Sequence, residues 1–326
     1  MSLLSSMFMY MLYFTALAAG LYGMVCLAQY AIFRNARIKQ PISKRSKIIC
    51  GVVGIATLCA GYEVLSYQAH VKNPRNTTIP NLSQLIEGVV IVTSLPQTSE
   101  NDLRSAFGVE NKEDKWSDRI TKTMLYIDFT ATYSRLFKGL FWGCMVSIVV
   151  GILMGCYDWL EAILLPPLNF LSFIPGTAMY AVFYAIVSTG EPIFLWMVAF
   201  GVMPILTKAI YLCAKHDLHD EEINKAYTLG ASNFEVTWNV VAQQVMPKII
   251  DNVRLQIGPA MVFLIAAEML VAQEGFGYRM RLLSRQLQMN VVYDYLLILG
   301  IIGLGMDKAT IWFRQWLCPW YDRRKS

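Results

Sequence analysis

Cysteine and histidine side chains recur at three-residue steps in the stretch CAKHDLHD. Cys213, His216 and His219 follow this spacing, and Asp220 comes next. Side chains three residues apart share one face of a helix, so this set could coordinate a metal ion such as Zn²⁺. A solvated helix at a membrane surface explains the same residues without a metal, and we favour that interpretation. We therefore predict no metal site.

Carboxylates interrupt two otherwise apolar stretches, at Glu63 and Glu268. An ionisable group near bilayer depth is costly, so such a group usually has a function or a buried partner. Glu268 could therefore be a functional residue, or it could belong to a structural ion pair. Glu63 is open to the same two interpretations.

Patterns typical of enzymes are not found in the sequence. The polar segment at roughly 68–130 contains no paired catalytic carboxylates and no Ser/His/Asp set. No phosphate-binding loop of the form G-x-x-x-x-G-K-[ST] occurs. We predict no catalytic residue and no cofactor on this chain.

The composition is that of an all-α integral membrane protein. Hydrophobic residues make up 56% of the 326 residues and charged residues only 16%, against about 25% charged in soluble domains. The net charge of +5 is read as an asymmetry between loops and not as a sign of nucleic-acid binding. The seven cysteines show no disulfide framework.

The N-terminal segment predicts a membrane span and its orientation. No charged residue occurs before Arg34, so the basic region of a signal peptide is missing, and residues 7–33 are too long for its apolar core. Six Lys or Arg residues then lie between Arg34 and Lys47. By the positive-inside rule this loop is cytoplasmic, which places the N-terminus outside.

About seven spans are expected in total, with the C-terminus in the cytoplasm. A basic tail after Arg314 supports that orientation. Three arginines, Arg279, Arg281 and Arg285, fall on the side assigned to the exterior, and we interpret their segment as a partly buried amphipathic turn. The predicted spans are residues 7–33, 48–67, 139–157, 162–190, 192–213, 255–273 and 292–313.

Two of the predicted spans have unusual residue patterns. In the third, small residues recur every fourth position and should let another helix approach closely; they are Gly139, Gly143, Ser147, Gly151 and Gly155. The fourth contains Pro166, Pro167 and Pro175. Either a broken helix near Pro175 lines a pathway, or a helix simply begins after the prolines.

The segment 214–247 predicts a capped helix–turn–helix on the cytoplasmic side. Gly230 is placed to end the first helix, and Ser232 with Glu235 forms a capping box for the second. Pro247 is expected to end the second helix. An apolar stripe along that helix predicts docking to a soluble partner; it consists of Phe234, Trp238, Val241 and Val245.

A DNA-reading helix–turn–helix is the alternative for this segment. Its first half is acidic, however, and lacks the Lys and Arg residues that phosphate contacts need. The acidic residues are Asp217, Asp220, Glu221 and Glu222. We therefore predict no nucleic-acid partner.

The stretch INKAYTLGASNFEVTWNVVAQQVMPKI resembles the EAA loop of bacterial ABC importer permeases. Gly230 and Pro247 match the family pattern, whereas its Glu-Ala-Ala triplet falls on Asn224, Lys225 and Ala226, of which only the last is retained. Other stretches are similar in the family's order, and the nearest branch serves nitrate, taurine and alkanesulfonates. The further matches are Pro80, Ser83, Gln84, Pro175, Gly190, Glu191, Pro204, Ala266, Ala267, Glu268, Gly275, Gly277 and Tyr278.

The resemblance implies a permease subunit of an ATP-driven importer in a bacterial inner membrane. Two copies would form the pathway, and two cytoplasmic ATPase subunits would carry ATP and Mg²⁺. An external binding protein would deliver a small solute, for which the nearest branch suggests an anion such as nitrate, taurine or a sulfonate. Pro175 and Glu268 would lie at the pathway. The residues that would couple to the ATPase are Asn224, Lys225, Ala226, Leu229, Gly230, Ala231, Ser232, Phe234, Trp238 and Pro247.

The chain also departs from the family, which usually has six spans. Accordingly we divide it into an additional helix with a basic loop (1–47), a second helix with an external loop (48–130), the permease core (131–313) and a basic tail (314–326). The external insertion at 94–122 has no assigned role. Two other functions stay open: a permease for another nutrient, such as a thiamine-pathway pyrimidine or a phosphonate, and a non-transporting membrane scaffold or sensor.

Overall fold

The computed structural model describes residues 44–72, 78–94, 124–187, 190–216 and 220–323. These residues form helices and turns and no strand, so the predicted all-α class is confirmed. The chain divides into two compact units, residues 1–84 and residues 85–326. The predicted span 7–33 and the insertion 94–122, apart from Ser94, lie outside the described residues.

The described part of the first unit contains α2 (Lys44–Lys72). Its apolar stretch Ile48–Val71 is long enough to cross a membrane, and its hydrophobic side chains are mostly exposed within this unit. The segment after α2 folds back onto it: Tyr62 Oη donates to Pro80 O at 2.8 Å, and Ser66 Oγ donates to Asn81 Oδ1 at 2.6 Å. The second predicted span is therefore present as one helix.

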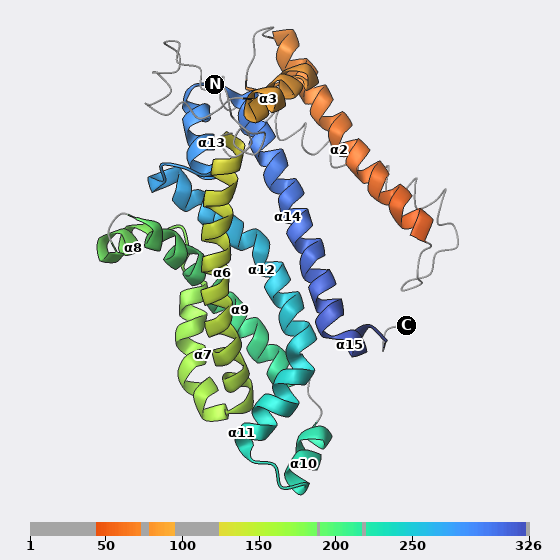
Figure 1. The fold of residues 1–326 in the computed structure, drawn as a ribbon, viewed down its shortest axis with the longest axis vertical. Coiled ribbons are helices and arrows are strands. Elements are labelled where there is room, and N and C mark those ends of the chain that lie inside the picture. Colours follow the sequence, from red (N-terminus) through yellow and green to blue (C-terminus); the bar gives the residue numbers. More distant parts are fainter. Residues whose placement is uncertain (1–43, 73–77, 95–123, 188–189, 217–219, 324–326) are drawn as a thin grey trace, which may run out of the picture. The chain divides into compact units, whose positions relative to one another are not determined.

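The second unit is a bundle in which α6, α9, α12 and α14 are the long helices (Figure 1). Each is long and apolar enough to cross a membrane, as is α2, which makes five candidate spans among the described residues. α10 and α11 lie at one end of the bundle and α13 at the other (Figure 1). The elements are α3 (Leu82–Ser94), α6 (Met124–Cys156), α7 (Asp158–Ser172), α8 (Tyr180–Val187), α9 (Glu191–His216), α10 (Asp220–Thr228), α11 (Asn233–Glu235), a π-helical turn (Val236–Val241), α12 (Ala242–Val271), α13 (Phe276–Arg285), α14 (Met289–Leu317) and α15 (Pro319–Arg323).

The most extensive helix contact joins α6 to α9. A methyl group on Gly139 would lie 2.6 Å from Val198 Cβ, and one on Gly155 would lie 2.4 Å from Ala214 Cβ. Between them, Ser147 Oγ donates to the backbone oxygen of Met203 at 3.2 Å. The small residues of α6 are thus the positions where the α9 backbone comes closest.

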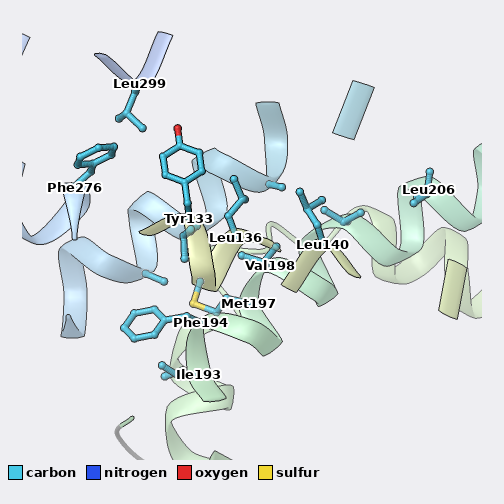
Figure 2. Close-up of a cluster of buried hydrophobic side chains, with 14 of the residues drawn as sticks. Tyr133, Leu136, Leu140, Ile193, Phe194, Met197, Val198, Leu206, Phe276 and Leu299 are labelled. Atoms are coloured by element: carbon cyan, nitrogen blue, oxygen red, sulfur yellow. The ribbon is translucent and has the colours of Figure 1, made fainter. Parts of the chain in front are cut away.

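The centre of the bundle is a continuous apolar core around this contact (Figure 2). Leu136 of α6 and Met197 and Val198 of α9 are fully buried there. Phe276 of α13 lies against Tyr133, with ring centroids 6.2 Å apart. The core therefore extends from the α6–α9 contact to the end of the bundle that carries α13.

The region predicted as a fourth span is two shorter helices. α7 ends at Ser172, and α8 begins at Tyr180. Pro175 lies in the break, where it lacks the N–H that a continuous helix would need, whereas Pro166 and Pro167 lie inside α7. Of the two alternatives left by the sequence, the structure has the broken helix.

Because α6 and α9 meet without space for a side chain, we expect Gly151→Leu to destabilise the bundle. A Cβ at Gly151 would lie 2.9 Å from the backbone oxygen of Thr207, so the helices must separate, at a cost of at least about 1–3 kcal/mol. Thermal unfolding in detergent measures this as a lowered midpoint. The control is Gly305→Leu in α14, where a Cβ meets nothing within 4 Å; an equal loss in both variants would contradict the role of the contact.

Candidate coupling surface and buried ion network

The segment between α9 and α12 is a tightly capped helical hairpin. After α10, Gly230 adopts φ +88°, and Ala231 N donates to Ala226 O at 3.1 Å. Ser232 then begins the second helix: Glu235 N donates to Ser232 Oγ at 3.4 Å, and Ser232 N donates back to Glu235 Oε2 at 2.8 Å. The predicted turn and capping box are both present, so the backbone of the hairpin is well defined.

Apolar side chains project from the turn of this hairpin. Leu229 is 88% exposed and Phe234 70% exposed, although both are hydrophobic. Tyr227 is exposed beside them, and the Phe234 ring lies 6.3 Å from that of Trp238. We call Tyr227, Leu229 and Phe234 the coupling surface, because exposed apolar side chains grouped on an ordered turn are typical of a protein-binding site.

The remaining predicted stripe does not belong to this surface. Val241 and Val245 are buried in the bundle core, and Trp238 is half-buried against it. Asn224, Lys225 and Ser232 are exposed around the turn, and Ala226 and Ala231 are half-buried. Only the part of the stripe nearest the turn is therefore accessible to a partner.

The prediction that Pro247 ends the second helix is wrong. Residues Asn233–Val271 form one helical stretch of 39 residues, which passes through a π-helical turn at Val236–Val241. Pro247 is buried inside α12. A proline removes only one backbone hydrogen bond from a helix, and neighbouring helices can compensate for this loss. The coupling surface is consequently continuous with a membrane helix, without a joint at Pro247.

Glu268 lies at the other end of α12 and is fully buried. Thr132 Oγ1 donates to its Oε1 at 2.9 Å, Arg135 Nη1 donates to the same oxygen at 3.1 Å, and Gly277 N donates to Oε2 at 2.9 Å. The structure shows the ion pair, and a role of Glu268 at the pathway stays a prediction.

Arg135 extends this network to α9 and to the turn after α12. Its Nε donates to Glu191 Oε2 at 2.9 Å, and its Nη1 donates to the backbone oxygen of Glu274 at 2.8 Å. Gly275, with φ +114°, passes directly over Glu268, and a Cβ there would lie 2.7 Å from Oε1. We call Thr132, Arg135, Glu191 and Glu268 the ion network.

Contacts within the bundle account for two of the three arginines that disagreed with the positive-inside rule. Arg279 Nε donates to Asp128 Oδ2 at 2.9 Å, and Tyr295 Oη donates to the same oxygen at 3.1 Å. Arg281 Nη1 donates to the backbone oxygens of Met269 and Leu270 at the end of α12. Arg279 and Arg281 of α13 thus serve structural contacts, as expected for a partly buried amphipathic turn, and Arg285 is exposed. Sequence analysis missed Asp128 and Arg135, because nothing local marks a partner more than a hundred residues away.

The predicted metal-type residues do not form a site among the residues that the structure describes. Cys213 Sγ accepts a hydrogen bond from Asn252 Nδ2 at 3.4 Å, and His216 is exposed. His219 lies outside the described residues. Six cysteines are described, and no disulfide joins any of them.

Residues 147–323 match the family described as binding-protein-dependent transport system inner membrane component. The chain belongs to this family. The match begins within α6 and includes the hairpin, α12 and α13, so the coupling surface lies inside it, as do Glu191 and Glu268 of the ion network. The predictions of an ABC importer permease and of its membrane fold are confirmed.

Curated relatives are permeases of the same kind. A probable ABC transporter permease of Brucella abortus (strain 2308) is 29% identical over 201 residues, which cover 60% of this chain and 78% of the relative. The taurine transport system permease TauC of Escherichia coli (strain K12) is 25% identical over 60% of this chain and 71% of its own length. The nitrate import permease NrtB of Synechocystis sp. is 23% identical over 88% of this chain and 96% of its own length.

A solved structure shares the fold. The MetNI methionine ABC transporter in inward-facing conformations matches with a TM-score of 0.52 and 16% identity, over 58% of this chain and 93% of the compared chain. At that identity the likeness concerns the fold alone.

Because Arg135 is buried against Glu268, we expect Glu268→Ala to destabilise the protein by about 3–5 kcal/mol, since it leaves a buried charge without its partner. The double variant Arg135→Met/Glu268→Leu removes both charges and should lose less than the sum of the single changes. Thermal unfolding in detergent checks this as a double-mutant cycle. Glu274→Ala is the control, because its carboxylate is 49% exposed and 3.8 Å from Arg135; a loss there equal to that of Glu268→Ala would contradict the expectation.

Proposed function

We propose that two copies of this chain form the pathway of an ABC importer for a small anion and that a cytoplasmic ATPase binds the coupling surface. The observation that carries the proposal is an exposed apolar pair, Leu229 and Phe234, on a capped turn that continues into a membrane helix. Water is a poor solvent for such side chains, and a groove in a soluble partner would bury them.

The ion network supports a lever-like use of α12 in transport. One end of the helix carries the coupling surface, and the other end is held by Arg135 to α6 and to Glu191 of α9. ATP-driven closure of the docked ATPase would displace the first end. Because the helix is continuous at Pro247, that motion would reach the membrane and bias the pathway between two arrangements.

The class of solute is supported by the relatives. Their names include permeases for taurine, for nitrate and, in Synechococcus elongatus, for bicarbonate, and each of these solutes carries an anionic group. By the same likeness an external solute-binding protein would deliver the anion, and ATP and Mg²⁺ would be bound by the ATPase. The basic segments after residue 33 and after residue 313 support an N-terminus outside and a C-terminus in the cytoplasm.

The docking step is tested by Phe234→Ala. We expect a tagged wild-type chain, purified from native membranes in mild detergent, to co-purify with a Walker-motif ATPase. The variant should recover much less of this ATPase, because an aromatic anchor that is buried in an interface typically contributes about 2 kcal/mol or more. Mass spectrometry of the recovered chains measures this. Trp159→Ala is the matched control, since that aromatic side chain is 63% exposed on another helix. If the wild-type chain comes down alone, or with unrelated membrane proteins, docking is wrong and a non-transporting scaffold becomes the better interpretation.

The turn itself is tested by Gly230→Val. A Cβ at Gly230 meets nothing within 4 Å, but φ +88° is strained for any residue with a side chain. The strain of about 1–2 kcal/mol should distort the hairpin locally, so we expect transport to fall while the membrane bundle keeps its thermal midpoint. Gly300→Val, at an open position in α14, should leave transport unchanged. Normal uptake by Gly230→Val would contradict a role of the turn in coupling.

A further inference from the structure

Lys208 is a charged residue inside the span Glu191–His216. It differs from the charged residues of the ion network in its hydrogen-bond partner. Arg135 pairs with Glu268, and Arg314 of α14 pairs with Asp251 at 2.6 Å. The half-buried Lys208 instead places its Nζ 3.3 Å from Ser172 Oγ. Within the part of the chain that the structure describes, no carboxylate forms an ion pair with it. A cation near bilayer depth needs a counter-charge or water.

The side chain of Lys208 does not extend toward the C-terminal end of α9, which is the nearer end of its helix. Lys215, close to that end, pairs with Glu161 in the first turn of α7, and Tyr211 Oη donates to the same carboxylate at 2.6 Å. The hydrogen bond from Lys215, and then that from Tyr211, lowers the pKa of Glu161, which keeps this counter-charge ionised. Lys208 meets Ser172, the last residue of α7. Since helical side chains lean toward the N-terminus of their helix, Lys208 points into the span and not to the membrane surface.

The break between α7 and α8 lies near the middle of the bundle. A methyl group on Gly176, within the break, would lie 2.9 Å from Cε1 of Phe263, and one on Gly201 of α9 would lie 2.2 Å from Cδ2 of the same ring. Gly201 is in the middle part of its span, so the break is at that level. Phe173, at the start of the break, is 84% exposed. Irregular backbone at such depth is tolerated only where it faces protein or a water-filled path.

The hydrogen bonds at the break leave Lys208 able to take a further ligand. Ser172 Oγ donates to Asn169 O at 2.8 Å, so toward Lys208 it acts as the acceptor. An ammonium group has three donors, and Ser172 uses one. Two donors and a full positive charge remain beside the broken helix.

We propose that Lys208 is the anion-binding residue of the translocation pathway: its ammonium pairs with the carboxylate, sulfonate, nitrate or bicarbonate group of the solute as it passes the break between α7 and α8. The inference rests on the proposed function and adds to it the residue that recognises the solute's charge. A compact ammonium suits several such groups, because it imposes no bidentate geometry.

The competing explanation is structural. A lysine beside the last turn of a helix also interacts favourably with the free carbonyl groups of that helix end. On that explanation Lys208 would stabilise α7, and the loss of its charge would lower the stability of the protein together with transport.

The experiment is anion uptake by the whole transporter, purified with its ATPase and binding protein and reconstituted into proteoliposomes. Labelled taurine, nitrate and bicarbonate are the probes. We expect Lys208→Met to lower kcat/KM for uptake by about tenfold or more, the effect of removing a hydrogen bond to a charged group. Lys208→Arg keeps the charge and should retain most of the uptake. Lys308→Met, an exposed lysine on another span, should behave as the wild type.

The thermal midpoint and the basal ATPase rate of each variant separate the two explanations. A loss of uptake by Lys208→Met at an unchanged midpoint, with recovery in Lys208→Arg, supports anion binding. Wild-type uptake by Lys208→Met overturns the inference while leaving the importer in place, as does a midpoint that falls in parallel with uptake. If the wild-type transporter imports none of the three anions, both the proposed class of solute and the inference about Lys208 are wrong.

Discussion

The buried pair of Arg135 and Glu268 is the interaction on which the arrangement of the second unit depends. It joins α6 to α12, and through Glu191 and the Glu274 carbonyl it also holds the start of α9 and the turn before α13. In a bilayer an unpaired charge at such a position finds no water, so the helices that provide the partners must stay together. Gly275 is part of the same constraint, because a side chain there would displace the carboxylate.

The close contact of α6 with α9 supplies a different kind of rigidity. Apolar side chains gain little by leaving lipid for another apolar surface, so helices in membranes associate through close packing. Gly139, Gly151 and Gly155 allow this packing along the C-terminal half of α6. The result is a stiff pair of helices against which α12 is positioned, with its ion network at one end and the hairpin at the other (Figure 1).

The break between α7 and α8 and the cation beside it stand apart from these constraints. Arg135, Arg279 and Arg281 have partners in the bundle, whereas Lys208 contacts a hydroxyl group at the end of a helix. In a protein that moves anions, a half-buried ammonium group without a carboxylate partner among the described residues has a physical use. The same location has irregular backbone, which is not tolerated where it faces lipid, and the Phe173 side chain there is exposed.

The sequence by itself determined the membrane class, four long spans of the second unit and the hairpin, because these follow from local composition and spacing. Gly230, Ser232 and Glu235 define the turn through hydrogen bonds between residues only three to five positions apart. The small residues of α6 predict a close helix contact. Tertiary structure alone decided the partners of Glu268 and Arg279, which lie on distant helices, and the division of the apolar stripe between core and surface. It also decided that the helix passes through Pro247, since neighbouring helices offset a lost hydrogen bond and no local rule records those neighbours.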